Sequence, residues 1–273
     1  MRSAIGFIKT LFSRFAEDDI FGLAAQLAYF FLLSLLPFMI FLVTLLGYLN
    51  IKEDRVIALI NVYAPPETID ILSENITSLF NDQNGGLLSF GVIGTLWAAS
   101  NGVNAIIKAF NRAHHVEENR SFFVSRVVAI VLTIAMVLVI AIAFLLPVLG
   151  NTIGTYVFSF FGMSNGFIAV WDALRWVISS VIFFIVLSFL YIMAPNKPLR
   201  YKDTVVGAVF ATIGWQLVSL LFSFYVSKMG SFSTTYGSLG GVIVLMIWFY
   251  LSGIVIITGG EINAIIYRRR VSP

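Results

Sequence analysis

The sequence predicts an all-α polytopic membrane protein with six transmembrane helices, an N-terminal interfacial helix and an external helical hairpin. Of its 273 residues, 59% are hydrophobic and only 11% are charged. The mean hydropathy is +0.94. This composition is too apolar for a soluble globular domain. Several stretches also reach the roughly 20 apolar residues that a helix needs to cross a hydrocarbon core about 30 Å thick.

The expected spans make residues 1–273 a single integral membrane domain. Helices are expected because a backbone that faces lipid must satisfy its own hydrogen bonds. The spans lie at about 24–49, 86–109, 127–149, 173–194, 204–227 and 238–262. The aromatic, glycine-interrupted stretch 152–171 is either interfacial or re-entrant, because a seventh span would reverse the orientation of everything after it.

Lysine and arginine residues set the orientation, since positive charge is retained on the cytoplasmic side. The six spans put thirteen of the seventeen on one side: Arg2, Lys9, Arg14, Lys108, Arg112, Arg120, Arg126, Lys197, Arg200, Lys202, Arg268, Arg269 and Arg270. The other side has Lys52, Arg55, Arg175 and Lys228. Both termini are therefore expected in the cytoplasm.

Two further helical segments are expected outside the spans. Residues 1–20 carry Ile5, Ile8, Phe12 and Phe15 on one helical face, with Lys9, Ser13 and Arg14 towards the other. This spacing favours a helix that lies in the cytoplasmic interface, with an extension of the first span as the alternative. Residues 50–85 are expected to form an external hairpin, which Pro65 and Pro66 divide into two short helices.

The small residues and prolines inside the spans predict close packing and kinks. Gly207, Ala211 and Gly214 form a stripe that lets neighbouring backbones approach each other. A similar stripe runs through Gly94 in the second span, and Pro37 should kink the first.

Polar residues inside the spans are expensive in hydrocarbon and gather towards the predicted cytoplasmic ends. We interpret them as an inner polar cluster made of Gln26, Asn101, Asn104, Lys108, Arg112, Gln216, Glu261 and Asn263. Two readings remain open: a network of hydrogen bonds between helices, and the lining of a cavity at the inner mouth of the bundle.

Glu261 ends the last apolar segment slightly inside the expected membrane boundary, where an unpaired carboxylate is costly. We expect a partner across the bundle, Lys108 or its neighbour Arg112, with Arg268 of the same helix as the alternative. On the outer side, Asp172 and Arg175 can meet on one helical face. They form either an interfacial ion pair or a contact for an anionic lipid headgroup.

Four long motifs occur in order along the chain: AAQLAYFFLLSLLPF, GTLWAASNGVNAIIKAFNRAH, GAVFATIGWQLVSLLFSFYV and YGSLGGVIVLMIWFYLSGIVIITGGEIN. Together they resemble the YihY/BrkB family of bacterial inner-membrane proteins. The resemblance covers about Phe15 to Tyr267, and Gly259, Gly260, Glu261 and Asn263 match the pattern that ends the family's last span. It implies six helices and cytoplasmic termini. Members are linked to virulence and envelope lipid traffic, and an older label calls the family a ribonuclease.

The function that we expect is transport or flipping of a lipid or other amphiphile in envelope maintenance. The alternative is a membrane scaffold or assembly factor that transports nothing. A ribonuclease needs catalytic residues and a basic face for RNA. The two histidines, His114 and His115, are adjacent and point in different directions on a helix. We therefore expect no enzyme activity and no catalytic residue.

Membrane lipids are the expected partners, with a homo-oligomer left open and no nucleic acid. We expect no cofactor and no metal. The chain has no cysteine that could ligate one, and no GxxxxGK[ST] loop that would bind a nucleotide phosphate.

The topology predicts where single cysteines react, because this cysteine-free chain gives no background labelling. Cysteines at Ser3 and Ser272 should react with a membrane-impermeant maleimide only after the cells are opened. A cysteine at Ser78 should react in intact cells. Labelling of position 272 from outside intact cells would contradict an even number of spans.

Overall fold

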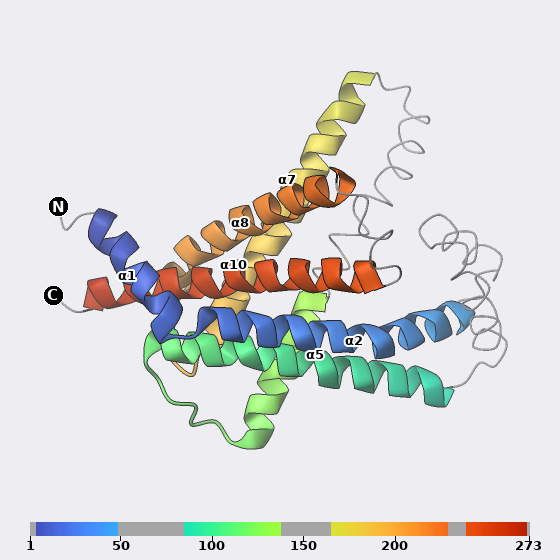
Figure 1. The fold of residues 1–273 in the computed structure, drawn as a ribbon, viewed down its shortest axis with the longest axis horizontal. Helices are drawn as coiled ribbons and strands as arrows, with labels where there is room; N and C mark the ends of the chain where they lie inside the picture. Colours follow the sequence, from blue (N-terminus) through green and yellow to red (C-terminus); the bar gives the residue numbers. More distant parts are fainter. Residues whose placement is uncertain (1–3, 49–84, 138–164, 229–238, 272–273) are drawn as a thin grey trace. The chain divides into compact units, whose positions relative to one another are not determined.

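The computed structural model describes residues 4–48, 85–137, 165–228 and 239–271, and every regular element in these ranges is an α-helix. The elements, seen in Figure 1, are α1 (Ala4–Glu17), α2 (Ile20–Tyr48), α5 (Gly85–His114), the helix Phe122–Val137, α7 (Asn165–Met193), α8 (Tyr201–Lys228) and α10 (Leu239–Val271). Five of them are long and apolar enough to cross a membrane. The predicted all-α, polytopic membrane fold is therefore confirmed.

The helices differ from the expected spans mainly at their ends. The helix Phe122–Val137 covers the first part of the span expected at 127–149, and the rest of that span lies outside the described residues. The count of six spans stays a prediction. The hairpin expected at 50–85 and most of the stretch 152–171 also lie outside the description. The last part of that stretch belongs to α7, which begins at Asn165.

The described helices form two compact units. The smaller unit, Phe30–Ala99, contains the second part of α2 and the first part of α5. A side chain at Gly91 would lie 2.7 Å from the backbone nitrogen of Phe41, and one at Gly94 would lie 3.0 Å from Pro37 Cβ. The small residues of α5 therefore let it pack directly on α2 around the helical proline, as the stripe through Gly94 predicts.

The larger unit, Met1–Tyr29 with Ser100–Pro273, holds the remaining helices. α8 packs on both α10 and α7, and α1 packs on α10. The closest approach is at Gly207, where an added Cβ would collide with the Gly259 carbonyl oxygen of α10. Gly214 lies against Val255 in the same way, and Ala211 between them is fully buried. The predicted packing role of this stripe is confirmed.

The termini of these helices meet in pairs at one end of the larger unit. Arg112, near the end of α5, contacts Asp18 and Asp19, which precede α2. Arg120, just before the helix Phe122–Val137, contacts the end of α7. Arg270, at the end of α10, pairs with Asp203 in the first turn of α8. At this end, which we call the arginine end, α2, the helix Phe122–Val137 and α8 begin, and α1, α5, α7 and α10 finish.

Gly207→Ala should destabilise the α8–α10 packing. Its Cβ would overlap the Gly259 carbonyl oxygen and the Asn263 side chain, and overpacking typically costs about 1–3 kcal/mol. Thermal unfolding in detergent should show a lower midpoint. Gly241→Ala is the matched control, because a Cβ there meets no atom within 4 Å. Equal midpoints for the two variants would contradict the close approach.

Candidate functional site

Three residues of the predicted inner polar cluster make hydrogen bonds between helices. Asn101 Oδ1 accepts a hydrogen bond of 2.7 Å from Arg126 Nη1. Gln216 Nε2 donates to Ser180 Oγ at 2.6 Å. Asn263 Oδ1 accepts from the Gly207 amide at 2.7 Å. These contacts agree with the plainer of the two readings of the sequence, a network that ties neighbouring helices together.

The other predicted residues are spread over different environments. Gln26 and Asn104 are partly exposed, whereas Lys108 and Arg112 are exposed. Glu261 is fully buried. The side chains of Asp172 and Arg175 lie outside the description, so that pair stays a prediction.

The partner of Glu261 is Arg14, which corrects the expectation of Lys108 or Arg112. Arg14 Nη1 lies 3.9 Å from Glu261 Oε2. α5 turns its Phe110 side towards α10, where the ring leaves no room for a side chain at Gly260. Lys108 and Arg112 are each two positions from Phe110, about 200° around a helix, and therefore point away from Glu261.

Two more charged groups, Asp18 and Arg268, surround this ion pair. Arg14 Nη1 donates a hydrogen bond of 3.2 Å to Asp18 Oδ2, so the guanidinium serves both carboxylates. The Asp18 carboxyl and the Arg268 guanidinium also interact electrostatically with the Glu261 side chain. Within the described part of the chain, neither oxygen of Glu261 accepts a hydrogen bond from a donor. We call Arg14, Asp18, Glu261 and Arg268 the arginine–carboxylate cluster.

Arg14 is directed inwards by the break between α1 and α2. α1 ends at Glu17 and α2 begins at Ile20. Between them, Asp19 has a φ of 55°, a left-handed conformation that aspartate tolerates better than most residues. Ile8 and Phe12 of α1 remain exposed while Arg14 is only 8% exposed. The apolar face of α1 therefore turns outwards, and Arg14 packs against α10. The amphipathic pattern of α1 suggests the opposite for Arg14, namely a side chain that faces water.

The C-terminus of α5 contacts both arginines of the arginine–carboxylate cluster. The last carbonyls of a helix lack partners within the helix and need donors from elsewhere. The Ala113 carbonyl accepts hydrogen bonds from both Arg14 Nη1 and Arg268 Nη2. One arginine comes from α1 and the other from α10, so the end of α5 ties the two terminal helices together.

His115 closes α5 in a Schellman motif. Its amide donates to the Arg112 carbonyl, and the Val116 amide donates to the Asn111 carbonyl. His115 has a φ of 51°, the left-handed conformation that this motif requires. Burial and the charges of Arg268 and Arg14 lower the pKa of His115 below its ordinary value. The neutral ring can then accept a hydrogen bond at Nε2 from Arg14 Nη2, which lies 3.3 Å away.

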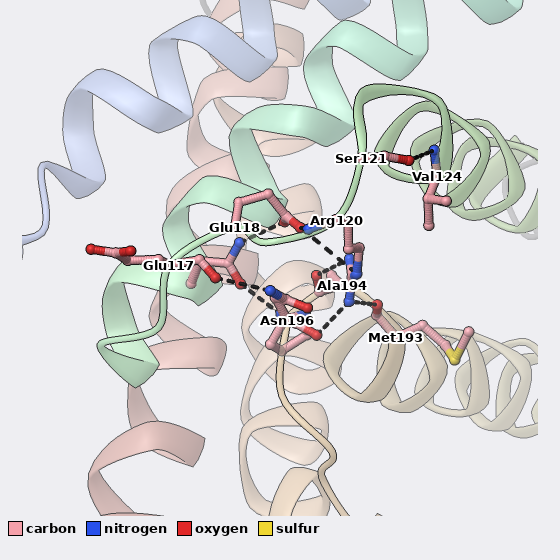
Figure 2. Close-up of polar contacts among 10 residues, drawn as sticks. Glu117, Glu118, Arg120, Ser121, Val124, Met193, Ala194 and Asn196 are labelled. Atoms are coloured by element: carbon pink, nitrogen blue, oxygen red, sulfur yellow. Dashed lines mark hydrogen bonds and ion pairs between the residues drawn. The ribbon is translucent and has the colours of Figure 1, made fainter.

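A second arginine cap holds the loop after α5 against the end of α7, as Figure 2 shows. Arg120 donates to the carbonyls of Met193, Ala194 and Pro195 at 3.3, 3.2 and 2.7 Å. A cation here also suits the negative end of the α7 dipole. The Glu118 carboxylate lies 3.8 Å from Arg120 Nε and orients its guanidinium.

Asn111 joins this cap to the end of α5. Its Oδ1 accepts from the Asn196 amide at 2.7 Å, and its Nδ2 donates to Glu118 Oε2 at 2.8 Å. The Asn196 side chain in turn donates to the Glu117 carbonyl at 2.9 Å (Figure 2). The loops that follow α5 and α7 are therefore held together by polar contacts.

The roles of Arg14, Asp18, Asn111 and Arg120 were not predicted from the sequence. Arg14 and Asp18 are four residues apart, a spacing that brings side chains together on a helix. That signal was available, but it does not predict the distant partner Glu261. Within the described ranges, no three His, Asp or Glu side chains are placed to hold a metal ion.

The chain is similar to known proteins along nearly its whole length. The family described as "Virulence factor BrkB" matches residues 11–273. The Bacillus subtilis (strain 168) protein named "Putative ribonuclease-like protein YfkH" is 53% identical over 98% of both chains. A UPF0761 membrane protein of Vibrio vulnificus (strain YJ016) is 27% identical over 98% of this chain and 84% of its own length. Another UPF0761 membrane protein, from Pseudoalteromonas atlantica, is 26% identical over 95% of this chain and 85% of its own length.

No solved structure matches the chain. The family match confirms the resemblance that the motifs indicate. With its long apolar helices and its relatives named as membrane proteins, the chain is a bacterial membrane protein that belongs to the BrkB family.

Proposed function

We propose that the protein moves a lipid or another amphiphile across the bacterial inner membrane in the course of envelope maintenance. The observation that carries this proposal is the ion pair between Arg14 and Glu261. Its 3.9 Å separation exceeds the length of a charge-assisted hydrogen bond, which is about 2.7–2.9 Å. Glu261 is nevertheless fully buried.

A buried carboxylate with no donor costs free energy, because it has lost its hydration without full compensation. Such a group favours any rearrangement that brings it a better partner or water. Movement of α1 or entry of a polar headgroup at the arginine end would supply one. The arginine–carboxylate cluster is thus suited to a gate that opens when Arg14 exchanges Glu261 for a headgroup.

The distribution of charge favours an amphiphile over a charged solute. The ion pairs among the described residues lie at the arginine end. Away from it, hydrogen bonds between neutral side chains join the helices, such as Gln216 to Ser180 and Trp248 to Ser219. An acyl chain is compatible with these surroundings, whereas a multiply charged solute would need compensating groups along its path.

In this proposal the arginine end faces the cytoplasm, and both termini lie there. The count of thirteen basic residues against four supports this orientation. Both chain termini follow the arginine end to the cytoplasmic side in this proposal, because α1 and α10 both finish there.

A scaffold or assembly factor remains the second candidate. The caps on α5 and α7 are compatible with it, because they hold several helix ends of this chain against one another. A ribonuclease, which the name of one relative suggests, has less support. His114 packs edge-on against Tyr267, and His115 closes α5, so both histidines have structural contacts. The proposed partners are membrane lipids, with self-association as an option and no nucleic acid.

Glu261→Gln should slow lipid movement while leaving insertion and folding intact. Glutamine keeps the size of the side chain but removes the charge that Arg14 faces. In proteoliposomes with headgroup-labelled lipid, the rate at which label becomes accessible to an external quencher should fall at least about tenfold, as expected for a loss of about 1.4 kcal/mol. Glu117→Gln is the matched control, since that side chain is exposed and the contact of Glu117 with Asn196 is made by its backbone carbonyl.

The Arg14→Gln variant should show a similar loss, and the double variant should be no slower than either single variant, because the two residues act as one unit. Additive losses would contradict the coupling. If wild-type protein moves lipid no faster than protein-free liposomes, the transport proposal fails and the scaffold takes its place.

A further inference from the structure

A surface pocket of about 560 Å³ lies at the arginine end, and Glu261 is not part of its lining. It is formed where the start of α8 meets the end of α10. Its lining consists of Pro198, Leu199, Arg200, Asp203, Tyr267, Arg270 and Val271. Two of these residues carry guanidinium groups, and one contributes an aromatic ring.

The one acid in the pocket lining is neutralised by its own contacts. Asp203 Oδ1 pairs with Arg270, and Oδ2 accepts a hydrogen bond of 3.0 Å from the Arg200 amide. The Asp203 side chain is only 6% exposed. Its negative charge is therefore directed into the protein and would not repel an anion at the mouth of the pocket.

The remaining charge around the pocket is positive. The Arg200 amide is bonded to Asp203, which leaves its exposed side chain available to a ligand. Lys197 Nζ lies 4.3 Å from the centre of the Tyr267 ring and brings a second cation to the wall that Tyr267 forms. The positive end of the 28-residue helix α8 also opens here.

We propose that this pocket binds a phosphate-bearing anion, with Arg200 as its principal contact. Guanidinium groups suit phosphate because they donate two parallel hydrogen bonds to its oxygens. Pro198, Leu199 and Val271 add an apolar rim, which suits a phosphate that is attached to a lipid. The source is thus the headgroup of an anionic phospholipid or a soluble phosphate compound, and the experiment below separates the two.

Binding is measured by native mass spectrometry of the full chain in detergent, titrated with phosphatidylglycerol. Phosphatidylethanolamine and glycerol phosphate are titrated in parallel. The apparent Kd for phosphatidylglycerol should weaken about tenfold in Arg200→Gln, which loses one charge-assisted contact. Arg200→Lys should recover part of the loss. Arg269→Gln is the matched control, because Arg269 stacks on Phe7 and does not line the pocket.

Loss of phosphatidylglycerol binding in Arg200→Gln but not in Arg269→Gln supports the site. Equal binding by wild type and Arg200→Gln overturns it. Equal affinity for phosphatidylethanolamine, which carries a phosphate but no net charge, overturns the selection of an anion. Glycerol phosphate that binds as tightly as the lipid identifies a soluble anion and overturns the lipid headgroup as the source. This measurement reports binding alone and is independent of the proteoliposome assay. If the protein binds phosphatidylglycerol here but moves no lipid in proteoliposomes, the transport proposal fails and this site stands.

Discussion

The architecture of the larger unit depends on how the open C-terminus of α5 is satisfied. A helix end that is buried away from water leaves carbonyl groups that must find donors. Ala113 receives two, from Arg14 of α1 and Arg268 of α10, so one carbonyl connects the first and last helices of the chain. Arg14 then places its charge beside Asp18 and Glu261. The cap of α5 and the burial of an acid are thus parts of one arrangement.

The fold was largely predictable because hydrocarbon imposes a simple rule on length and polarity. Long apolar runs marked five helices, and the spacing of Gly207, Ala211 and Gly214 marked the face of α8 that meets α10. The ends of these helices were harder to predict, since hydropathy changes gradually there. α10 continues to Val271, well past the expected limit at 262, and carries Arg268 as a helical residue beside the end of α5.

The candidate site was only partly predictable, because hydropathy does not determine the rotation of one helix against another. Glu261 was recognised from its cost in an apolar segment, but its partner depends on which side of α5 faces α10. Phe110 occupies that side and directs Lys108 outwards. Arg14 is distant in sequence, and its amphipathic helix suggested a side chain towards water. The turn at Asp19 reverses that expectation, and no periodic pattern encodes such a turn.

The long sequence separation between Arg14 and its partners has a consequence for biosynthesis. Helix α1 leaves the ribosome first, whereas the end of α5 follows about a hundred residues later and Glu261 is among the last residues made. Until Ala113 and His115 at the end of α5 are made, Arg14 has only its local contact with Asp18. A chain truncated between α5 and Glu261 would keep the contact of Arg14 with the Ala113 carbonyl but would lack its contact with Glu261. The first helix therefore docks in two stages, first on the end of α5 and then on α10.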